Sequence, residues 1–144
     1  YANNKINAYK QIRNKVIFNK THKTNTHTND GLSILYFARQ FVKSNKKFKV
    51  PTIIKSDIEY TYLNFTTKKE NIEIDAVNYP VRTIYFNGKA DWKGIYGLSG
   101  EFEGWFSDDD ASIPIVAKMN VYLGSIRIEL ISWTRKNWQP PKAN

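Results

Sequence analysis

Carboxylates in the C-terminal third are the residues whose type and spacing come closest to a chemical site. Asp108, Asp109 and Asp110 are consecutive, and Glu101 and Glu103 alternate a few residues earlier. Calcium loops take oxygen ligands from alternating positions and close with a further carboxylate, a pattern that three adjacent aspartates do not meet. We therefore predict a solvent-exposed hairpin loop for the aspartates. Paired carboxylates can serve acid–base chemistry, but no second group is aimed at the glutamates, so we predict an outward polar strand face.

The two histidines lie five residues apart in a uniformly polar segment, residues 20–29. Metal binding by His22 and His27 would need further ligands, and Asp30 is the only carboxylate nearby in the sequence. General-base catalysis would need a serine or carboxylate partner, and none is specifically placed beside either ring. We predict an exposed loop that carries two solvated histidines.

Composition and glycine spacing limit the remaining chemistry. The chain has no cysteine, which excludes disulfides, thiolate metal sites and cysteine nucleophiles. The glycines at positions 94, 97, 100 and 104 lack the Lys-Ser/Thr ending of a phosphate loop, and they predict bulges or tight curvature in strands instead. We accordingly predict no catalytic residues, no metal and no cofactor.

The elements that position these residues are clearest between residues 94 and 133. Apolar side chains at alternate positions over residues 115–123 predict a strand with one buried face. From Ile126 onward the apolar side chains occupy even-numbered instead of odd-numbered positions. A two-residue type II′ turn at Gly124–Ser125 would keep both sets on the same face of the sheet. An upstream strand over residues 98–106 completes a predicted three-stranded antiparallel meander.

Short β segments fill much of the chain before the meander. Alternating, β-branched and aromatic stretches predict strands near residues 13–18, 48–54, 58–65, 72–76 and 79–86. Lys68–Glu70 is predicted to be a turn, and Asn87–Gly88 is the strongest hairpin signal, suited to a type I′ turn. The total is about eight strands.

One segment has the periodicity of a helix. Apolar residues recur between Leu32 and Val42 as a broad stripe, which predicts a long helix over residues 30–44. Asn29 or Asp30 can cap its N-terminus. A stripe of this kind normally belongs to a core, so we predict that it packs on the sheet, with a ligand-facing role as the alternative.

The C-terminal tail, residues 133–142, interleaves tryptophans with cationic side chains. This mixture could stack nucleic-acid bases or lie at a membrane interface. We favour the simpler interpretation of a frayed C-terminus.

The charge of the chain is unevenly distributed. The net charge is +9, and residues 1–55 contain 12 Lys or Arg residues against the single Asp30. A basic block of this kind can bind nucleic acid or an anionic membrane surface. We favour composition as its origin, because Asn, Lys, Ile and Tyr are abundant throughout, as in proteins from AT-rich genomes.

At 144 residues the chain is expected to form one domain, residues 1–144, with a single core. No apolar run approaches the roughly 20 residues that a membrane-spanning helix needs. The chain begins at Tyr1 without an initiator methionine, so we expect a processed product or a fragment.

Several segments resemble a known family. The residues concerned are Trp105-Phe-Ser-Asp-Asp-Asp-Ala-Ser-Ile-Pro-Ile115, then Ala117-Lys118, then Leu123-Gly-Ser-Ile-Arg-Ile-Glu-Leu130. They are similar to the signature of domain of unknown function family 3108, with its Trp, Ser/Thr-Asp-Asp turn, aliphatic-Pro pair and Gly-Ser before a closing leucine. The segment from Asp30 to Arg39 resembles that family's aspartate-capped helix. The segment Asp75–Pro80 departs from the family's glycine-containing turn.

The resemblance implies a fold, a compartment and a type of ligand. Members are exported proteins, mostly of Gram-negative bacteria, so it implies the periplasm or the outer-membrane face. The family is similar to lipoprotein-carrier folds, in which a curved antiparallel sheet wraps over helices as an open half-barrel, and this implies an apolar ligand. The family's N-terminal strands are missing, which implies the C-terminal part of a longer exported protein. No activity is established for the family, so no catalytic residue carries over.

These observations predict a mainly β (α+β) protein, with a curved antiparallel sheet or open half-barrel of about eight strands packed over one long helix. We expect a non-enzymatic envelope protein that binds a lipid, acyl chain or hydrophobic peptide in a groove between sheet and helix. The candidate lining residues are Tyr36, Phe37, Phe41, Trp105, Met119 and Val121. The alternatives are a surface-interaction module whose basic face, residues 5–55, binds an anionic partner, and a hydrolytic enzyme.

Overall fold

The structure is a computed structural model that describes residues 4–92, 100–121 and 124–144. Within these ranges it contains nine strands and one helix, in the following order. They are β1 (Lys5–Ile12), β2 (Lys15–Lys23), β3 (Asn29–Asp30), α1 (Ser33–Phe41), β4 (Lys47–Ile54), β5 (Asp57–Ile72), β6 (Val81–Ala90), β7 (Gly100–Ser107), β8 (Pro114–Val121) and β9 (Gly124–Glu129). The predicted mainly β class is confirmed, whereas the predicted long helix is wrong, because α1 has nine residues.

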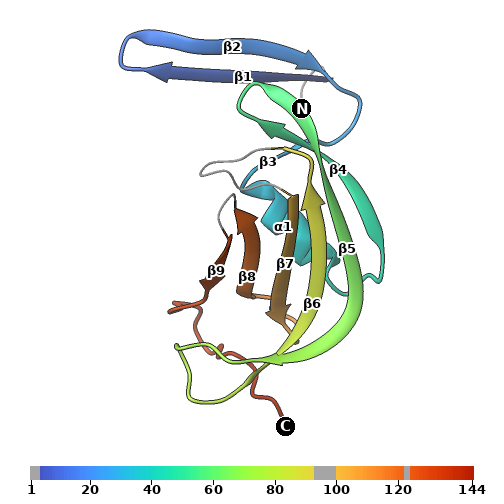
Figure 1. The fold of residues 1–144 in the computed structure, drawn as a ribbon, viewed down its shortest axis with the longest axis vertical. Helices are drawn as coiled ribbons and strands as arrows, with labels where there is room; N and C mark the ends of the chain where they lie inside the picture. The colour runs from blue at the N-terminus through green and yellow to red at the C-terminus, as the bar shows by residue number, and fades with distance from the viewer. Residues whose placement is uncertain (1–3, 93–99, 122–123) are drawn as a thin grey trace.

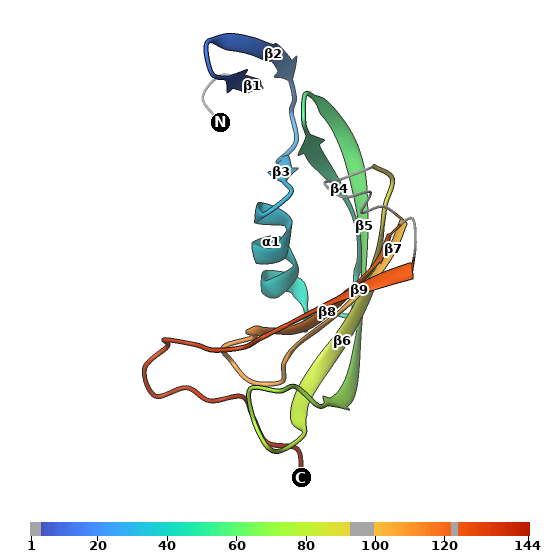
Figure 2. The same cartoon turned by 60° about the vertical axis from the view of Figure 1, so that its left-hand side comes forward.

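Seven strands form one open sheet in the order β3-β4-β5-β6-β7-β8-β9. Neighbours are antiparallel except for β3 and β4, which pair in parallel. The sheet is curved, and α1 lies on its concave side (Figures 1 and 2). The predicted open antiparallel sheet is therefore confirmed.

A cluster of aromatic and aliphatic side chains packs between the C-terminal half of α1 and the sheet. Ala38 and Val42, at the C-terminal end of the helix, pack with Leu63, Phe65, Ile84, Phe86 and Phe106. Phe37, Phe41 and Phe48 pack against this cluster with ring centroids 4.7–5.2 Å apart. Complete burial of one such side chain stabilises a fold by about 1.5–3 kcal/mol. The C-terminal half of α1 is thus part of the core.

The N-terminus of α1 is fixed by reciprocal hydrogen bonds between Asp30 and Ser33. The backbone N–H groups of Leu32 and Ser33 donate to Oδ1 of Asp30 over 2.9 and 2.7 Å, and the Asp30 N–H donates to Oγ of Ser33 over 2.7 Å. The bond from the Ser33 backbone is the main reason that the pKa of Asp30 is lowered. The Asp30 carboxylate therefore holds the turn that leads into α1, while both Asn29 and Asp30 belong to β3.

Strands β8 and β9 form the predicted hairpin with a different turn position. Val121 pairs with Gly124 and Asn120 with Ser125, so Gly124 and Ser125 open β9 rather than form the turn. The register places Ile126 opposite Met119, which explains the parity shift. Residues 122 and 123 lie outside the described residues, as does the segment 93–99, on which part of the predicted meander falls.

The predicted turns at Asn87–Gly88 and Lys68–Glu70 are wrong. Asn87 and Gly88 lie inside β6 and pair on both sides, with β5 and with β7. Gly88 is needed for packing, since a Cβ there would stand 2.3 Å from the ring of Phe102. Lys68–Glu70 belongs to β5, where the pairing with β6 shifts between Phe65 and Lys69 as a bulge.

Strands β1 and β2 form a separate two-stranded antiparallel ribbon, called here the N-terminal hairpin (residues 5–23). It stands apart from the larger sheet (Figures 1 and 2). Its turn contains Arg13, at φ 52°, a residue that we predicted to begin a strand. The predicted exposed loop at residues 20–29 is wrong for His22, which lies in β2 and is within hydrogen-bonding distance of the Ser56 carbonyl at 2.6 Å.

The C-terminal tail is docked on the protein, so the predicted frayed terminus is wrong. The backbone N–H of Arg82 donates to the Pro141 carbonyl over 2.8 Å, and that of Ala143 donates to the Pro80 carbonyl over 2.9 Å. Trp138 packs against a second buried cluster, formed by Ile74, Val81, Trp105, Ile115 and Val116. The tail therefore extends the core at the end of the sheet.

Candidate functional site

An apolar cavity of about 300 Å³ lies between α1 and the concave face of the sheet. Its lining comes from the start of α1 and from strands β5 to β9. The residues are Gly31, Leu32, Ile34, Leu35, Ala38, Thr61, Leu63, Phe86, Ala90, Trp92, Gly100, Glu101, Phe102, Glu103, Ala117, Met119 and Ile128. We call this space the helix–sheet cavity.

The inner wall of the helix–sheet cavity is buried and apolar. Leu63, Phe86 and Ala38 belong to the core cluster and form its deep end. Two of the polar groups at the wall are paired with each other, since Trp92 Nε1 donates to Thr61 Oγ1 over 2.9 Å. Thr61 Oγ1 is also 2.8 Å from the hydroxyl of Thr52. With these groups satisfied by one another, the wall presents mainly carbon to any occupant.

The rim of the helix–sheet cavity is mainly apolar, and its aliphatic side chains reach solvent beside the exposed Glu101. Leu32 and Leu35 on the helix side and Ile128 on β9 line the cavity and are exposed, Leu32 to 76%. Exposed aliphatic side chains around a hollow are the usual surroundings of a site that accepts an apolar molecule. The cavity thus has an apolar entrance as well as an apolar interior.

The structure brings only part of the predicted lining set to this cavity. Met119 is in its wall. Phe37 and Phe41 pack with Phe48 in the core instead. Tyr36 is 73% exposed and lies beside a shallow depression with Arg39 and Lys43, because it falls on the outer side of the short helix.

Trp105 and Val121 are also placed elsewhere. Trp105 points to the face of the sheet opposite α1, since side chains alternate along β7 and Phe106 is the one that faces the helix. Its Nε1 donates to Glu70 Oε2 over 2.7 Å. Val121 is half-buried at the end of β8, opposite Gly124, and does not line the helix–sheet cavity.

Sequence reasoning missed the lining residues that share a face with Met119. Ala117 lies two residues before Met119 on β8, and Phe102 is the partner of Met119 on β7. The alternation along β8 was visible in the sequence. The pairing of β7 with β8 was the missing information, because it determines which of the two alternating sets of β7 side chains faces the helix.

Asp109 is a structural residue rather than a solvated one. Its Oδ1 accepts from Ser107 Oγ over 2.8 Å and from the backbone N–H groups of Ala111 and Ser112 over 3.0 Å each. Its Oδ2 accepts from Trp138 Nε1 over 2.7 Å. Burial alone would raise the pKa of Asp109, but these four hydrogen bonds together lower it.

The other two aspartates form ion pairs instead of this set of hydrogen bonds. Asp108 is paired with Arg82 at 3.1 Å and with Lys69 at 2.8 Å, while Asp110 is exposed, 3.6 Å from Lys43. The predicted loop between two strands is confirmed, but only Asp110 is solvated as predicted. Within the described ranges, no group of three or more His, Cys, Asp or Glu residues converges as a metal site would require.

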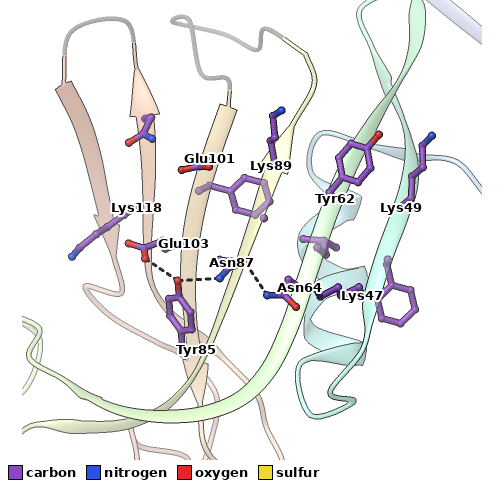
Figure 3. Close-up of a pocket in the computed structure, with 15 residues that line it drawn as sticks. Lys47, Lys49, Tyr62, Asn64, Tyr85, Asn87, Lys89, Glu101, Glu103 and Lys118 are labelled. Carbon is purple, nitrogen blue, oxygen red and sulfur yellow. Dashed lines mark hydrogen bonds between the residues drawn. The ribbon is translucent and has the colours of Figure 1, made fainter.

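A larger groove, of about 790 Å³, lies on the opposite face of the sheet, where the labelled side chains project away from α1 (Figure 3). We call it the outer groove. Four lysines and two glutamates line it, together with asparagines and tyrosines. The charged members are Lys47, Lys49, Lys89, Lys118, Glu101 and Glu103.

The polar side chains in the outer groove are connected to one another (Figure 3). Asn64 Nδ2 donates to Asn87 Oδ1 over 3.1 Å, and Asn87 Nδ2 donates to the Tyr85 hydroxyl over 3.3 Å. The Tyr85 hydroxyl donates to Glu103 Oε1 over 2.8 Å. Burial, more than any neighbouring group, raises the pKa of Tyr85. This chain of bonds satisfies Glu103, so the predicted outward polar face describes this surface well.

Fold and cavity together define a class: an open, curved, largely antiparallel sheet that, in the part of the chain that the structure describes, holds an apolar cavity against one helix. The chain belongs to the family described as "Protein of unknown function (DUF3108)", whose profile matches residues 1–131. The resemblance predicted from the sequence is therefore confirmed. Comparison with curated proteins finds no match, and comparison with solved structures finds none either. No helix in the described ranges is long and apolar enough to span a bilayer.

Proposed function

We propose that this protein binds an apolar ligand, an acyl chain or a molecule of similar shape, in the helix–sheet cavity. The observation that carries the proposal is the apolar space of about 300 Å³ between α1 and the sheet, open at a rim of exposed aliphatic side chains. Protein pockets that bind small molecules have volumes of roughly 300–1,000 Å³ and mainly apolar walls.

The size of the cavity indicates what would fit. An apolar protein cavity of about 150 Å³ stays dry and takes up benzene, so a space twice that size suits a short alkyl chain. Each methylene group that leaves water contributes about 0.8 kcal/mol. The end of a chain would lie against Phe86 and Met119, and its polar head would remain at the rim near Leu32.

Binding without catalysis is the form of this proposal that the lining supports best. The polar side chains nearest the interior, Thr61 and Trp92, bond to each other rather than point into the space. Glu103, which contributes to the wall, directs its carboxylate to Tyr85 on the opposite face. These groups hold the sheet together, and the cavity offers a ligand a surface rather than a reactive group.

The proposed setting is the bacterial envelope, as the periplasm or the outer-membrane face. The support is the family to which the chain belongs, together with a curved open sheet that has its helix on the concave side. The resemblance of the sequence to the family further implies a likeness to lipoprotein-carrier folds, and we include this likeness in the proposal.

A series of straight-chain carboxylates of increasing length tests the binding proposal. The charged head is constant along the series, so only the buried length changes. Affinity measured by calorimetry is expected to rise about fourfold for each added methylene and to level off once the cavity is full.

Two tryptophan substitutions locate the site. Met119→Trp fills the cavity and is expected to remove the length dependence, while Ile131→Trp, at a position 80% exposed and outside the lining, is expected to leave it unchanged. Affinity that does not depend on chain length would refute the proposal. An equal loss in both variants would refute it as well.

A further inference from the structure

The N-terminal hairpin combines a charge pattern and an exposure pattern that the helix–sheet cavity does not use. Residues 1–23 contain six Lys or Arg residues and no Asp or Glu, whereas all 13 acidic residues of the chain come later. A composition bias adds lysines throughout the chain, but it does not remove carboxylates from one segment. The hairpin is therefore a distinct cationic element.

The tip of this hairpin also exposes apolar side chains. Tyr9, Ile12, Val16 and Ile17 each leave about half of their surface in solvent. Lys10, Arg13 and Lys15 lie among them around the turn, and all three are exposed. Aliphatic side chains left in water beside cations are typical of segments that lie in a membrane interface.

The base of the hairpin is attached to the protein, and this leaves the tip available. Lys20 forms an ion pair with Asp57, and His22 lies 2.6 Å from the Ser56 carbonyl, both at the start of β5. Ala8, near the same end, is buried. The contacts hold the ribbon in place while its turn projects beyond the sheet (Figures 1 and 2).

We propose that the tip of the N-terminal hairpin docks on an anionic lipid bilayer. Ile12, Val16 and Ile17 enter the boundary between headgroups and acyl chains, and Arg13 and Lys15 contact lipid phosphates. Each cation near an anionic surface strengthens binding about fivefold, and the effect falls within a Debye length.

Charge and side-chain type favour a bilayer over other occupants. A second copy would bring two cationic hairpins together, and their repulsion opposes that pairing. Single-stranded nucleic acid is bound through aromatic stacking platforms, whereas the tip exposes three aliphatic side chains and one ring, that of Tyr9, with Phe18 half-buried near it. Aliphatic groups gain little from nucleic-acid phosphates but partition into a lipid interface.

Co-sedimentation of the whole chain with vesicles tests this proposal without involving the cavity. Vesicles of phosphatidylcholine alone are compared with vesicles that also contain phosphatidylglycerol. Binding is expected only to the anionic vesicles and is expected to weaken as salt is raised. Equal binding to both compositions, or no dependence on salt, would overturn the proposal.

Variants separate the two contributions of the tip. The triple variant Ile12→Ser, Val16→Ser and Ile17→Ser is expected to weaken vesicle binding at least tenfold, whereas Ile131→Ser is expected to leave it unchanged. The pair Arg13→Gln and Lys15→Gln is expected to weaken it about 25-fold, with Lys136→Gln as the control. All of these positions are exposed and lie outside the two buried clusters, so the substitutions leave the core side chains unchanged.

Other results would contradict the proposal or assign the tip to a different binding partner. Tip variants that bind vesicles as the unchanged protein does would overturn the proposal. Loss of self-association in the triple variant, with vesicle binding intact, would assign the tip to a second copy. Binding to an oligonucleotide but not to anionic vesicles would assign it to nucleic acid.

Discussion

Replacing Asp109 by alanine is expected to lower the free energy of unfolding by about 3 kcal/mol. The change removes the acceptor of four hydrogen bonds, from Ser107, Ala111, Ser112 and Trp138, whose donors are partly buried. A buried donor left without a partner costs about 1–3 kcal/mol, and some of the four regain water. The loss should be visible as a lower urea midpoint with an unchanged slope.

Asp110→Ala is the matched control, because it removes a neighbouring carboxylate of the same loop. Asp110 is exposed, and its nearest cation, Lys43, is 3.6 Å away. Its loss is expected to change the free energy of unfolding by less than about 0.5 kcal/mol. If the two variants were destabilised equally, the assigned role of Asp109 as the link between loop and tail would be wrong.

The same carboxylate gives a prediction for acid. The pKa of Asp109 is lowered, since the hydrogen bonds outweigh the burial that would raise it. A lowered pKa contributes stability above the unfolded value of about 4, and this contribution is lost as the pH falls through the folded value. The difference in unfolding free energy between the unchanged protein and Asp109→Ala should therefore shrink below about pH 4.

Gly88→Ala is expected to destabilise the protein by about 3 kcal/mol. The new Cβ would stand 2.3 Å from Cζ of the Phe102 ring and 2.4 Å from the backbone oxygen of Tyr62. The ring can turn away at a cost in core packing, but the carbonyl belongs to the paired strand β5 and cannot. Overpacking of this kind costs about 1–3 kcal/mol, and a backbone clash belongs at the upper end.

The control for this change is Gly31→Ala. A Cβ on Gly31 would have no atom within 4 Å, so the substitution adds a methyl group in open space. Its effect on the unfolding free energy is expected to stay within about 1 kcal/mol. Thermal unfolding of both variants by circular dichroism compares them directly. Equal melting temperatures would mean that the contact between Phe102 and Gly88 does not exist in solution.

Gly88 and Asp109 also show where a prediction from the local sequence fails because of contacts made elsewhere in the fold. Asn87–Gly88 has the residues of a tight hairpin turn, but the glycine serves close packing between strands. The three aspartates look like one polar loop, but the donors of Asp109 come from the loop itself and from Trp138, which is distant in sequence. Neither long-range partner can be deduced from the residues around the signal.

Periodic signals were more dependable than turn signals. The alternation over β8 and the shift at Ile126 predicted the β8–β9 hairpin, although Gly124 and Ser125 belong to β9 and not to the turn. The helical stripe predicted α1, but Asp30 delays its start to Ser33, and Asn45, at φ 50°, follows its end. Helix position could be predicted from side-chain period, whereas helix length depended on these terminal contacts.

The candidate site was predictable in type but not in detail. Aromatic and aliphatic residues on a helix and a sheet face indicated an apolar space between them, and Met119 was assigned to it. Trp105 was assigned to the wrong face because a one-residue change of register moves every side chain of a strand across the sheet. The pairing of β7 with its neighbours supplies that register, and a single sequence does not contain it.

A crystal structure of the protein grown with decanoate tests the central proposal most directly. We expect electron density for the alkyl chain between α1 and the sheet, against Phe86 and Met119, with the carboxylate at the rim near Leu32. An interior that stays free of the ligand when decanoate is saturating, or decanoate bound only in the outer groove, would contradict it.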